Sequence, residues 1–158
     1  MRGWRWFLVL SIFLLLAVAT GGLASAARVK LDVRAATLSK TGDTTWEGTA
    51  RSKQLGKGKL TLTGNVTFPK VQGEPTRSKL RFRVTFKKGF LSGCFRNTIG
   101  KRPRNRLVWD GPGQVTGSSS SLRRYRGVRV RDGGLTKTDD LTHARPFGFT
   151  TDAPGARC

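Results

Sequence analysis

Apolar residues in this chain recur at every second position, and this pattern limits the fold more than any other feature. The clearest run spans residues 79–87, where Leu, Phe, Val and Phe alternate with Lys, Arg, Arg and Thr. Shorter runs with the same period lie at 29–34, 60–68, 106–109, 128–131 and 147–149. Alternation places every second side chain on one face, so these runs predict half-buried β-strands.

Turn residues separate the predicted strands at short and regular intervals. Glycine-containing turn signals fall at 41–43, 88–89, 110–113 and 132–134, and loops are expected at 69–78 and 117–121. The pattern therefore predicts an all-β fold, an antiparallel barrel of about eight strands. A β-sandwich built from the same strands is the alternative.

The first 26 residues have the layout of a secretory signal peptide. Two arginines precede an apolar run over residues 6–19, and small residues at 24 and 26 suit a peptidase cleft. Cleavage after Ala26 leaves 27–158 as a single β-barrel domain in a secreted or cell-envelope protein, outside the cytoplasm and with no integral membrane domain. An uncleaved membrane anchor over residues 6–27 is the alternative.

The chain carries a large net positive charge. Its 158 residues include 30 Lys and Arg against 9 Asp and Glu, a formal charge of +21. Loss of the leader removes Arg2 and Arg5 and no acid, so 28 basic and 9 acidic residues leave +19 on the domain. This charge opposes compaction and favours anionic partners.

The single His143 and two cysteines exclude the usual zinc sites, so we expect no metal and no cofactor.

Cys94 and Cys158 are the two cysteines, and an even count in an exported chain predicts a disulfide between them. On the loop-entropy model, closing so long a loop stabilises the fold by about 4 kcal/mol. Free thiols and a bond between chains through Cys158 are the alternatives.

Basic residues gather in three places: on alternate positions of 79–87, at 101–106, and around Tyr125, whose ring is a candidate for stacking on a sugar. The candidate anion-binding residues are Lys79, Arg81, Arg83, Arg104, Arg106, Arg124, Arg126, Arg129 and Arg131. Arginine grips phosphate, sulfate or carboxylate groups through paired hydrogen bonds. The alternative is a solvated basic exterior that binds acidic molecules without selectivity.

The segment GPGQVTGSSSSLRRYRGVRV, residues 111–130, resembles small barrels of the dirigent and allene oxide cyclase type. In those families a strand ends in a glycine-rich turn, an aromatic residue follows, and a second glycine opens the next strand. The resemblance implies an eight-stranded barrel that holds a small hydrophobic molecule in its mouth, cyclising it or guiding a radical coupling. The chain departs from the pattern at 118–121, where serines replace a tighter Gly-Thr-Gly turn, and no catalytic residue matches.

Acid and imidazole groups come close together in the sequence only at 139–143. Asp140 and His143 are candidates for a catalytic pair that would act as a general base, the alternative being a loop acid and a surface imidazole. The sequence identifies no accompanying nucleophile or oxyanion site. A non-enzymatic role is therefore the expectation.

Two classes of function fit these features. The first is binding of an anionic polymer by the basic outer strands: a wall polymer, an acidic polysaccharide or a nucleic acid. The second is a barrel that encloses a small hydrophobic ligand, with isomerase or cyclase activity as an option. Its inward residues would include Phe82, Phe86, Trp109 and Phe147. Envelope attachment or oligomerisation through Cys158 is a third, structural role.

Overall fold

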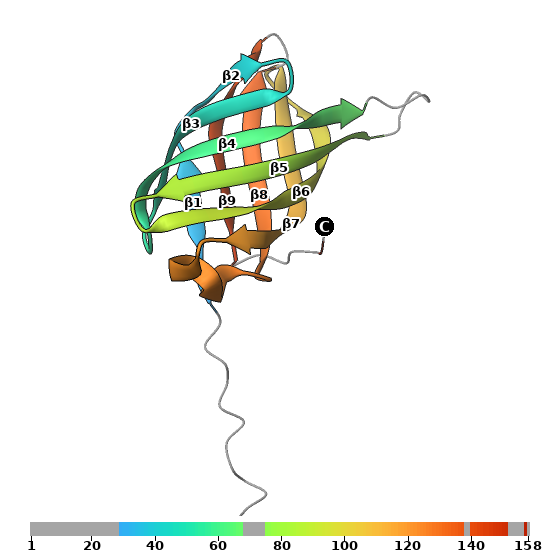
Figure 1. Cartoon of the computed structure of the whole chain (residues 1–158). Helices are drawn as coiled ribbons and strands as arrows, with labels where there is room; N and C mark the ends of the chain where they lie inside the picture. Colours follow the sequence, from blue (N-terminus) through green and yellow to red (C-terminus); the bar gives the residue numbers. More distant parts are fainter. Residues whose placement is uncertain (1–28, 68–74, 138–139, 152–156, 158) are drawn as a thin grey trace, which may run out of the picture.

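Nine antiparallel strands form a single closed sheet in the computed structural model, which describes residues 29–67, 75–137, 140–151 and 157 (Figure 1). The elements in chain order are β1 (Asp32–Ala35), β2 (Leu38–Gly42), β3 (Thr45–Ser52), β4 (Gly56–Thr67), β5 (Thr76–Phe86), β6 (Gly89–Arg102), β7 (Arg106–Ser118), the 3₁₀ helix η1 (Ser120–Tyr125), β8 (Arg129–Lys137) and β9 (Asp140–Thr150).

The sheet closes because β1 and β2 each pair with both β3 and β9. These two short strands share one position in the barrel, interrupted at residues 36–37, so the nine strands fill eight positions. The prediction of an antiparallel barrel of about eight strands is confirmed. The predicted signal peptide lies outside the described residues, and no helix in the described part is long and apolar enough to cross a membrane.

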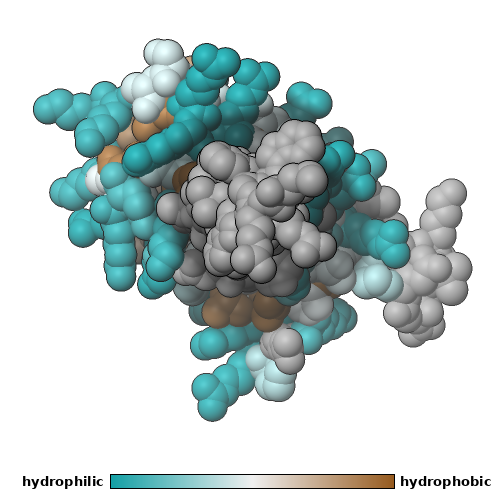
Figure 2. Space-filling view, turned by 90° about the horizontal axis from the view of Figure 1, so that it is seen from below, coloured by the Kyte–Doolittle hydropathy of each residue, from teal (hydrophilic) through white to brown (hydrophobic). Residues whose placement is uncertain are grey.

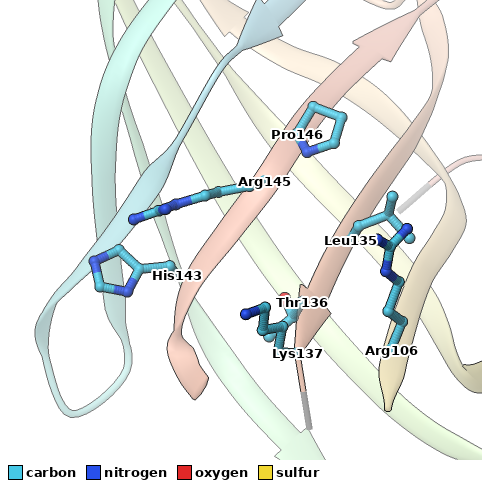
Figure 3. A pocket seen from close by; sticks show the side chains of 7 residues that line it. All are labelled: Arg106, Leu135, Thr136, Lys137, His143, Arg145 and Pro146. Atoms are coloured by element: carbon cyan, nitrogen blue, oxygen red, sulfur yellow. The ribbon is translucent and has the colours of Figure 1, made fainter. Parts of the chain in front are cut away.

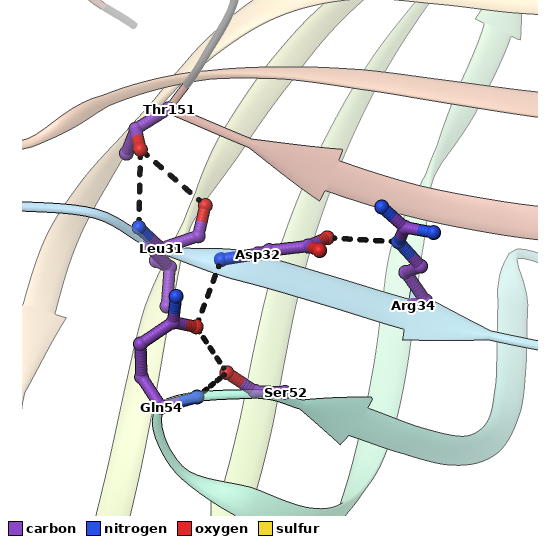
Figure 4. A network of polar contacts seen from close by, with 6 residues as sticks. All are labelled: Leu31, Asp32, Arg34, Ser52, Gln54 and Thr151. Carbon is purple, nitrogen blue, oxygen red and sulfur yellow. Dashed lines mark hydrogen bonds and ion pairs between the residues drawn. The ribbon is translucent and has the colours of Figure 1, made fainter.

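Hydrogen bonds join the first and last strands of the sheet where β1 meets β9 (Figure 4). The Leu31 amide donates to Thr151 Oγ1 at 3.0 Å, and the Thr151 amide donates to the Leu31 carbonyl at 2.9 Å. On the other side of β1, the Asp32 amide donates to Gln54 Oε1 at 3.3 Å, and Ser52 Oγ donates to the same oxygen at 3.0 Å. Gln54 of the β3–β4 turn thus links β1 to Ser52 at the end of β3.

Four phenylalanines pack together at the centre of the barrel. Phe82 stacks on Phe95 with ring centroids 4.7 Å apart, and Phe149 lies 4.8 Å from Phe82 and 5.4 Å from Phe95. Phe147 meets Phe95 edge-on at 6.2 Å. All four side chains are buried, and such aromatic pairs contribute about 0.5–1.5 kcal/mol each beyond their area burial.

Three of these rings face a glycine on the neighbouring strand. The register pairs Phe82 with Gly93, Phe95 with Gly113 and Phe147 with Gly134. A Cβ atom at Gly93 would lie 2.6 Å from Phe82 Cε1, and one at Gly134 would lie 2.9 Å from Phe147 Cδ2. The glycines therefore provide the space that the rings occupy.

This packing corrects two predicted turns. Residues 110–113 and 132–134 lie inside β7 and β8, where their glycines face neighbouring strands and make no bend. The turns predicted at 41–43 and 88–89 do connect hairpins. In the predicted loop at 69–78, β5 already begins at Thr76, and 69–74 lie outside the described residues.

One end of the barrel is closed by η1, the short helix that follows β7 at the bottom of Figure 1. Leu122 and Tyr125 point from this helix into the core and are 2% and 1% exposed. The predicted loop at 117–121 is instead the passage from β7 into η1. The opposite end carries the β2–β3, β6–β7 and β8–β9 connections and has no such helix among the described residues.

The substitution Gly93→Ala tests the requirement for space beneath Phe82. The added methyl group must displace the Phe82 ring or the β7 backbone, so we expect a loss of about 2 kcal/mol in the free energy of unfolding. Gly100→Ala is the matched control on the same strand, because a Cβ atom there meets nothing within 4 Å. Urea denaturation measures both, and equal stability of the two variants would contradict this account of the core.

Candidate functional site

A pocket of about 810 Å³ lies in the open end of the barrel, opposite η1. We call it the mouth pocket; its lining residues are Lys40, Asp43, Thr44, Trp46, Gly64, Asn65, Val66, Thr76, Ile99, Lys101, Leu107 and Trp109. The indoles of Trp46 and Trp109, both in this lining, contact each other edge-on, with ring centroids 6.4 Å apart and planes at 67°. The wall is therefore largely apolar and aromatic.

Strand register explains which residues reach this pocket. Trp109 on β7 pairs with Ile99 on β6 and with Gly134 on β8. These residues therefore lie at one level inside the barrel, and Ile99 and Trp109 form part of the floor of the mouth pocket. Lys40 and Lys101 are exposed. Phe82, Phe86 and Phe147, which the sequence placed in the interior, are buried there as predicted; none of them lines the mouth pocket.

A buried carboxylate and amide form a polar pair inside the barrel. Asn97 on β6 donates from Nδ2 to Asp132 Oδ2 on β8 at 2.6 Å, and both residues are 2% exposed. The pair spans Gly111 of the intervening β7, where a Cβ atom would lie 2.5 Å from Asn97 Oδ1. Neither residue was predicted as part of a site. Alternation could have identified Asn97 as an inward polar residue, because it lies two residues from each of the inward Phe95 and Ile99.

The environments of Asp132 and Asp110 shift their pKa values in opposite directions. Desolvation by burial raises the pKa of Asp132 to about 7, although the hydrogen bond from Asn97 opposes this. On the outer surface, the guanidinium of Arg131 binds both carboxylate oxygens of Asp110 and lowers the pKa of that group. Arg131, a candidate anion-binding residue, is thus already paired with an acid.

The outer surface of β5 carries an unbroken row of exposed cations: Arg77, Lys79, Arg81 and Arg83. The β4 residues in register with this row are Thr67, Asn65, Thr63 and Thr61; those on β6 are Thr98, Arg96, Cys94 and Ser92. We call this surface the basic face. No carboxylate occurs among these positions, so the positive charges of the row have no acidic neighbour on its three strands.

Two shallow hollows lie on the basic face. One of about 640 Å³ is lined by Thr61, Arg81, Arg83 and Ser92, among others, and one of about 660 Å³ by Asn65, Lys79, Arg81 and Arg96. Both reach Cys94, which lies on β6 in the middle of the face. Cys158 lies outside the described residues, so the disulfide between them stays a prediction.

The three basic clusters do not converge on one surface. Arg104 and Arg106 lie at the β6–β7 turn beside the mouth, whereas Arg124 and Arg126 lie on and just after η1 at the other end. The remaining candidates from the third cluster, Arg129 and Arg131, lie on β8. From the η1 end the periphery is mostly hydrophilic, with small hydrophobic patches (Figure 2).

Tyr125 is not available for stacking on a ligand, contrary to the expectation. Its side chain is 1% exposed because it closes the barrel end. Arg124 covers its ring, with the guanidinium carbon 4.9 Å from the ring centroid, and donates to the phenol oxygen at 3.0 Å.

A smaller pocket of about 300 Å³ lies beside His143 on β9 (Figure 3). Arg106, Lys137 and Arg145 contribute cations to its lining. His143 Nδ1 is 2.9 Å from Thr142 Oγ1. The Asp140 side chain lies outside the described residues, so its pairing with His143 remains untested. Within the described ranges, no three His, Cys, Asp or Glu residues cluster as metal ligands would.

The raised pKa of Asp132 predicts a pH-dependent stability. The folded state holds its proton up to about pH 7, whereas the unfolded carboxyl loses it near pH 4, so unfolding becomes easier as pH rises between these values. We expect the free energy of unfolding to fall by about 2–3 kcal/mol from pH 5 to pH 8 through this group. Asp132→Asn should remove that fall, measured by urea denaturation at both pH values.

Asp43→Asn is the control for this experiment, because Asp43 is exposed at the β2–β3 turn. It should keep the wild-type difference between the two pH values. An unchanged pH profile in Asp132→Asn would contradict the assignment.

Comparison with known proteins returned no match: no protein-family model, curated protein or solved structure is significantly similar to this chain. The resemblance to dirigent and allene oxide cyclase proteins therefore stays a prediction, and the functional argument depends on the site geometry.

Proposed function

We propose that the protein binds a linear anionic polymer of the cell envelope or its surroundings along the basic face. The observation that carries this proposal is the row of four exposed cations on β5, spaced at every second residue with no acid on the flanking strands. Alternate residues of a strand are about 6.6 Å apart, so the row offers regularly spaced charges to an extended chain of phosphate, sulfate or carboxylate groups.

The neighbours of the row support the proposal. Hydroxyl groups of Thr63 and Ser92 lie beside the arginines, and such groups hydrogen-bond anionic oxygens without repelling them. The Thr61 hydroxyl, at the edge of the face, donates to Glu47 Oε1 on β3 at 3.3 Å. Arg83 lies over the ring of Phe90, with the guanidinium carbon 3.9 Å from the centroid, a contact that holds the guanidinium in place. A positioned guanidinium loses less conformational freedom on binding.

The triple substitution of Lys79, Arg81 and Arg83 by Gln tests this proposal with a short DNA duplex as a generic polyanion. Each phosphate contact contributes about 0.9 to the slope of log affinity against log salt, so the slope should weaken by about 3. A control triple changes exposed Lys30, Arg51 and Lys53 to Gln and removes the same charge from the segment before β1, from β3 and from the β3–β4 turn. Fluorescence anisotropy at salt concentrations from about 50 to 200 mM measures the slope for both triple variants, because binding through phosphate contacts weakens strongly over this range.

If the two triple variants lose the same amount of DNA affinity, binding depends on net charge alone, and the basic face is not the site. Binding that does not change with salt would overturn the ionic mechanism altogether.

We propose a second function for the mouth pocket, binding of a small, largely apolar ligand. The pocket volume of about 810 Å³ is within the range of small-molecule sites, and two indoles that contact each other edge-on contribute to its lining. The barrel is packed below by the phenylalanine cluster and closed at the far end by η1. A ligand would therefore enter and leave through the mouth alone.

Trp46→Ala should weaken binding of the neutral dye N-phenyl-1-naphthylamine at least tenfold, because it removes one aromatic wall of the pocket. Trp46→Phe is the matched control and should cost no more than about threefold, since a ring remains. Dye fluorescence titration gives both dissociation constants. Unchanged binding by the Ala variant would place the dye elsewhere and overturn this second function.

A further inference from the structure

The central strand of the basic face is regular along its whole length. β5 pairs with β4 from Arg77 to Phe86 and with β6 from Thr76 to Phe86, and neither register contains a shift. The basic residues of β8 are arranged differently, because Arg131 binds Asp110 and the register of β8 with β9 shifts. The four cations of the β5 row therefore lie at equal intervals on one uninterrupted strand.

The interval between these cations corresponds to a particular polymer repeat. Two residues of an extended strand contain six backbone bonds and span about 6.6 Å. In a phosphodiester chain whose phosphates are joined through three carbon atoms, six covalent bonds also separate one phosphorus atom from the next. The extended repeat of such a chain is therefore close to that of the strand, and each phosphate can meet one cation of the row.

The two hollows of the basic face alternate with the cations. The hollow of about 660 Å³ is lined by Lys79 and Arg81, and the hollow of about 640 Å³ by Arg81 and Arg83. Thr63 lines both hollows and Ser92 lines the second, so hydroxyl groups reach the spaces between neighbouring cations. The neutral linkers of a phosphodiester chain would lie over these hollows, where a linker that carries a hydroxyl group finds hydrogen-bonding partners.

The outward residues of the basic face provide no ring for a nucleic-acid base. The row and the positions in register with it on β4 and β6 include no aromatic residue. Phe90, near the end of the row, lies under the guanidinium of Arg83, whose central carbon is 3.9 Å from the ring centroid. Proteins that bind single-stranded nucleic acid without sequence preference stack the bases on aromatic side chains. The face therefore suits a phosphodiester backbone without bases.

We infer that the polymer bound by the basic face is a polyol phosphate, a phosphodiester chain with three carbon atoms between successive phosphates. The cations of the β5 row contact its phosphates, and the hydroxyl groups of the two hollows contact its linkers. This inference rests on the first proposed function, binding of an anionic polymer along the basic face, and names the class of that polymer.

Synthetic oligomers with eight phosphates each, joined by ethanediol, propanediol or butanediol, test the spacing at constant charge. One bond more or less changes the repeat by about 1.1 Å, which adds up to about 3.3 Å over the three intervals of the row. Propanediol should therefore bind at least threefold more tightly than ethanediol, which is too short, and at least twofold more tightly than butanediol, which must contract. Competition against a labelled propanediol oligomer, followed by fluorescence anisotropy at about 50 mM salt, gives the affinities.

The triple substitution of Lys79, Arg81 and Arg83 by Gln should remove this preference, so that the ethanediol oligomer binds at least as tightly as the propanediol oligomer. The control triple described above should keep the wild-type preference. All the substituted side chains are exposed, so we expect both variants to fold, which circular dichroism establishes.

Two further oligomers with eight phosphates separate the possible sources of the polymer. Oligothymidylate has the same six-bond repeat and adds bases, and it should bind within threefold of the propanediol oligomer because the face has no stacking ring. A glycerol phosphate oligomer should bind at least as tightly as the propanediol oligomer, because its hydroxyl groups can reach Thr63 and Ser92. Oligothymidylate that binds at least tenfold more tightly than both would overturn the polyol phosphate in favour of a nucleic acid.

The results distinguish failure of this inference from failure of the first proposed function. Wild-type affinity that rises steadily as the linker shortens reflects charge density alone and overturns recognition of the spacing. The basic face remains the polyanion site in that case, provided that its triple variant still loses more affinity than the control triple. If the two triple variants lose the same affinity for every oligomer, the basic face is not the site, and both proposals are wrong.

Discussion

The interior volume of an eight-position barrel is the constraint on which the rest of this structure depends. Such a barrel is just wide enough for side chains to fill, so a large ring on one strand requires a small residue opposite. Here the rings of Phe82, Phe95 and Phe147 face glycines on neighbouring strands. Because the centre is filled in this way, the buried pair of Asn97 and Asp132 lies outside the phenylalanine cluster, and the excess cations are left on the outer surface.

Alternation predicted the all-β class and runs that match six of the nine strands, because period two is a property of the backbone. It identified no run over β2, β3 or β6, and it did not decide between a barrel and a sandwich. It was not sufficient to interpret the glycines. Asp-Gly at 110–111 and at 132–133 has the composition of a hairpin turn, yet both pairs lie inside long strands. The deciding contacts come from other strands: Asn97 packs over Gly111, and the Phe147 ring occupies the space beside Gly134. A local signal contains no information about such partners.

The same distinction applies to the sites. The outward row on β5 could be predicted, since exposure follows directly from alternation. The contact between Asn97 and Asp132 could not, because it depends on the register of β6, β7 and β8 together. Arg131 was placed correctly on the outer surface but misjudged in availability, and Tyr125 was wrongly expected to be available for stacking. One is paired with Asp110 and the other is buried in the barrel end, and both facts depend on tertiary contacts.

The seam between β1 and β9 has a kinetic consequence. Leu31 and Thr151, 120 residues apart in the chain, exchange hydrogen bonds, so the sheet cannot close until its last strand has been synthesised. Folds dominated by such distant pairings form slowly, on the order of milliseconds to seconds. Until β9 joins, β1 and β8 present unpaired edges that can template association with other chains. The net charge of +21 along the chain repels copies of itself during that interval, so the same arginines and lysines also protect the unfinished barrel from aggregation.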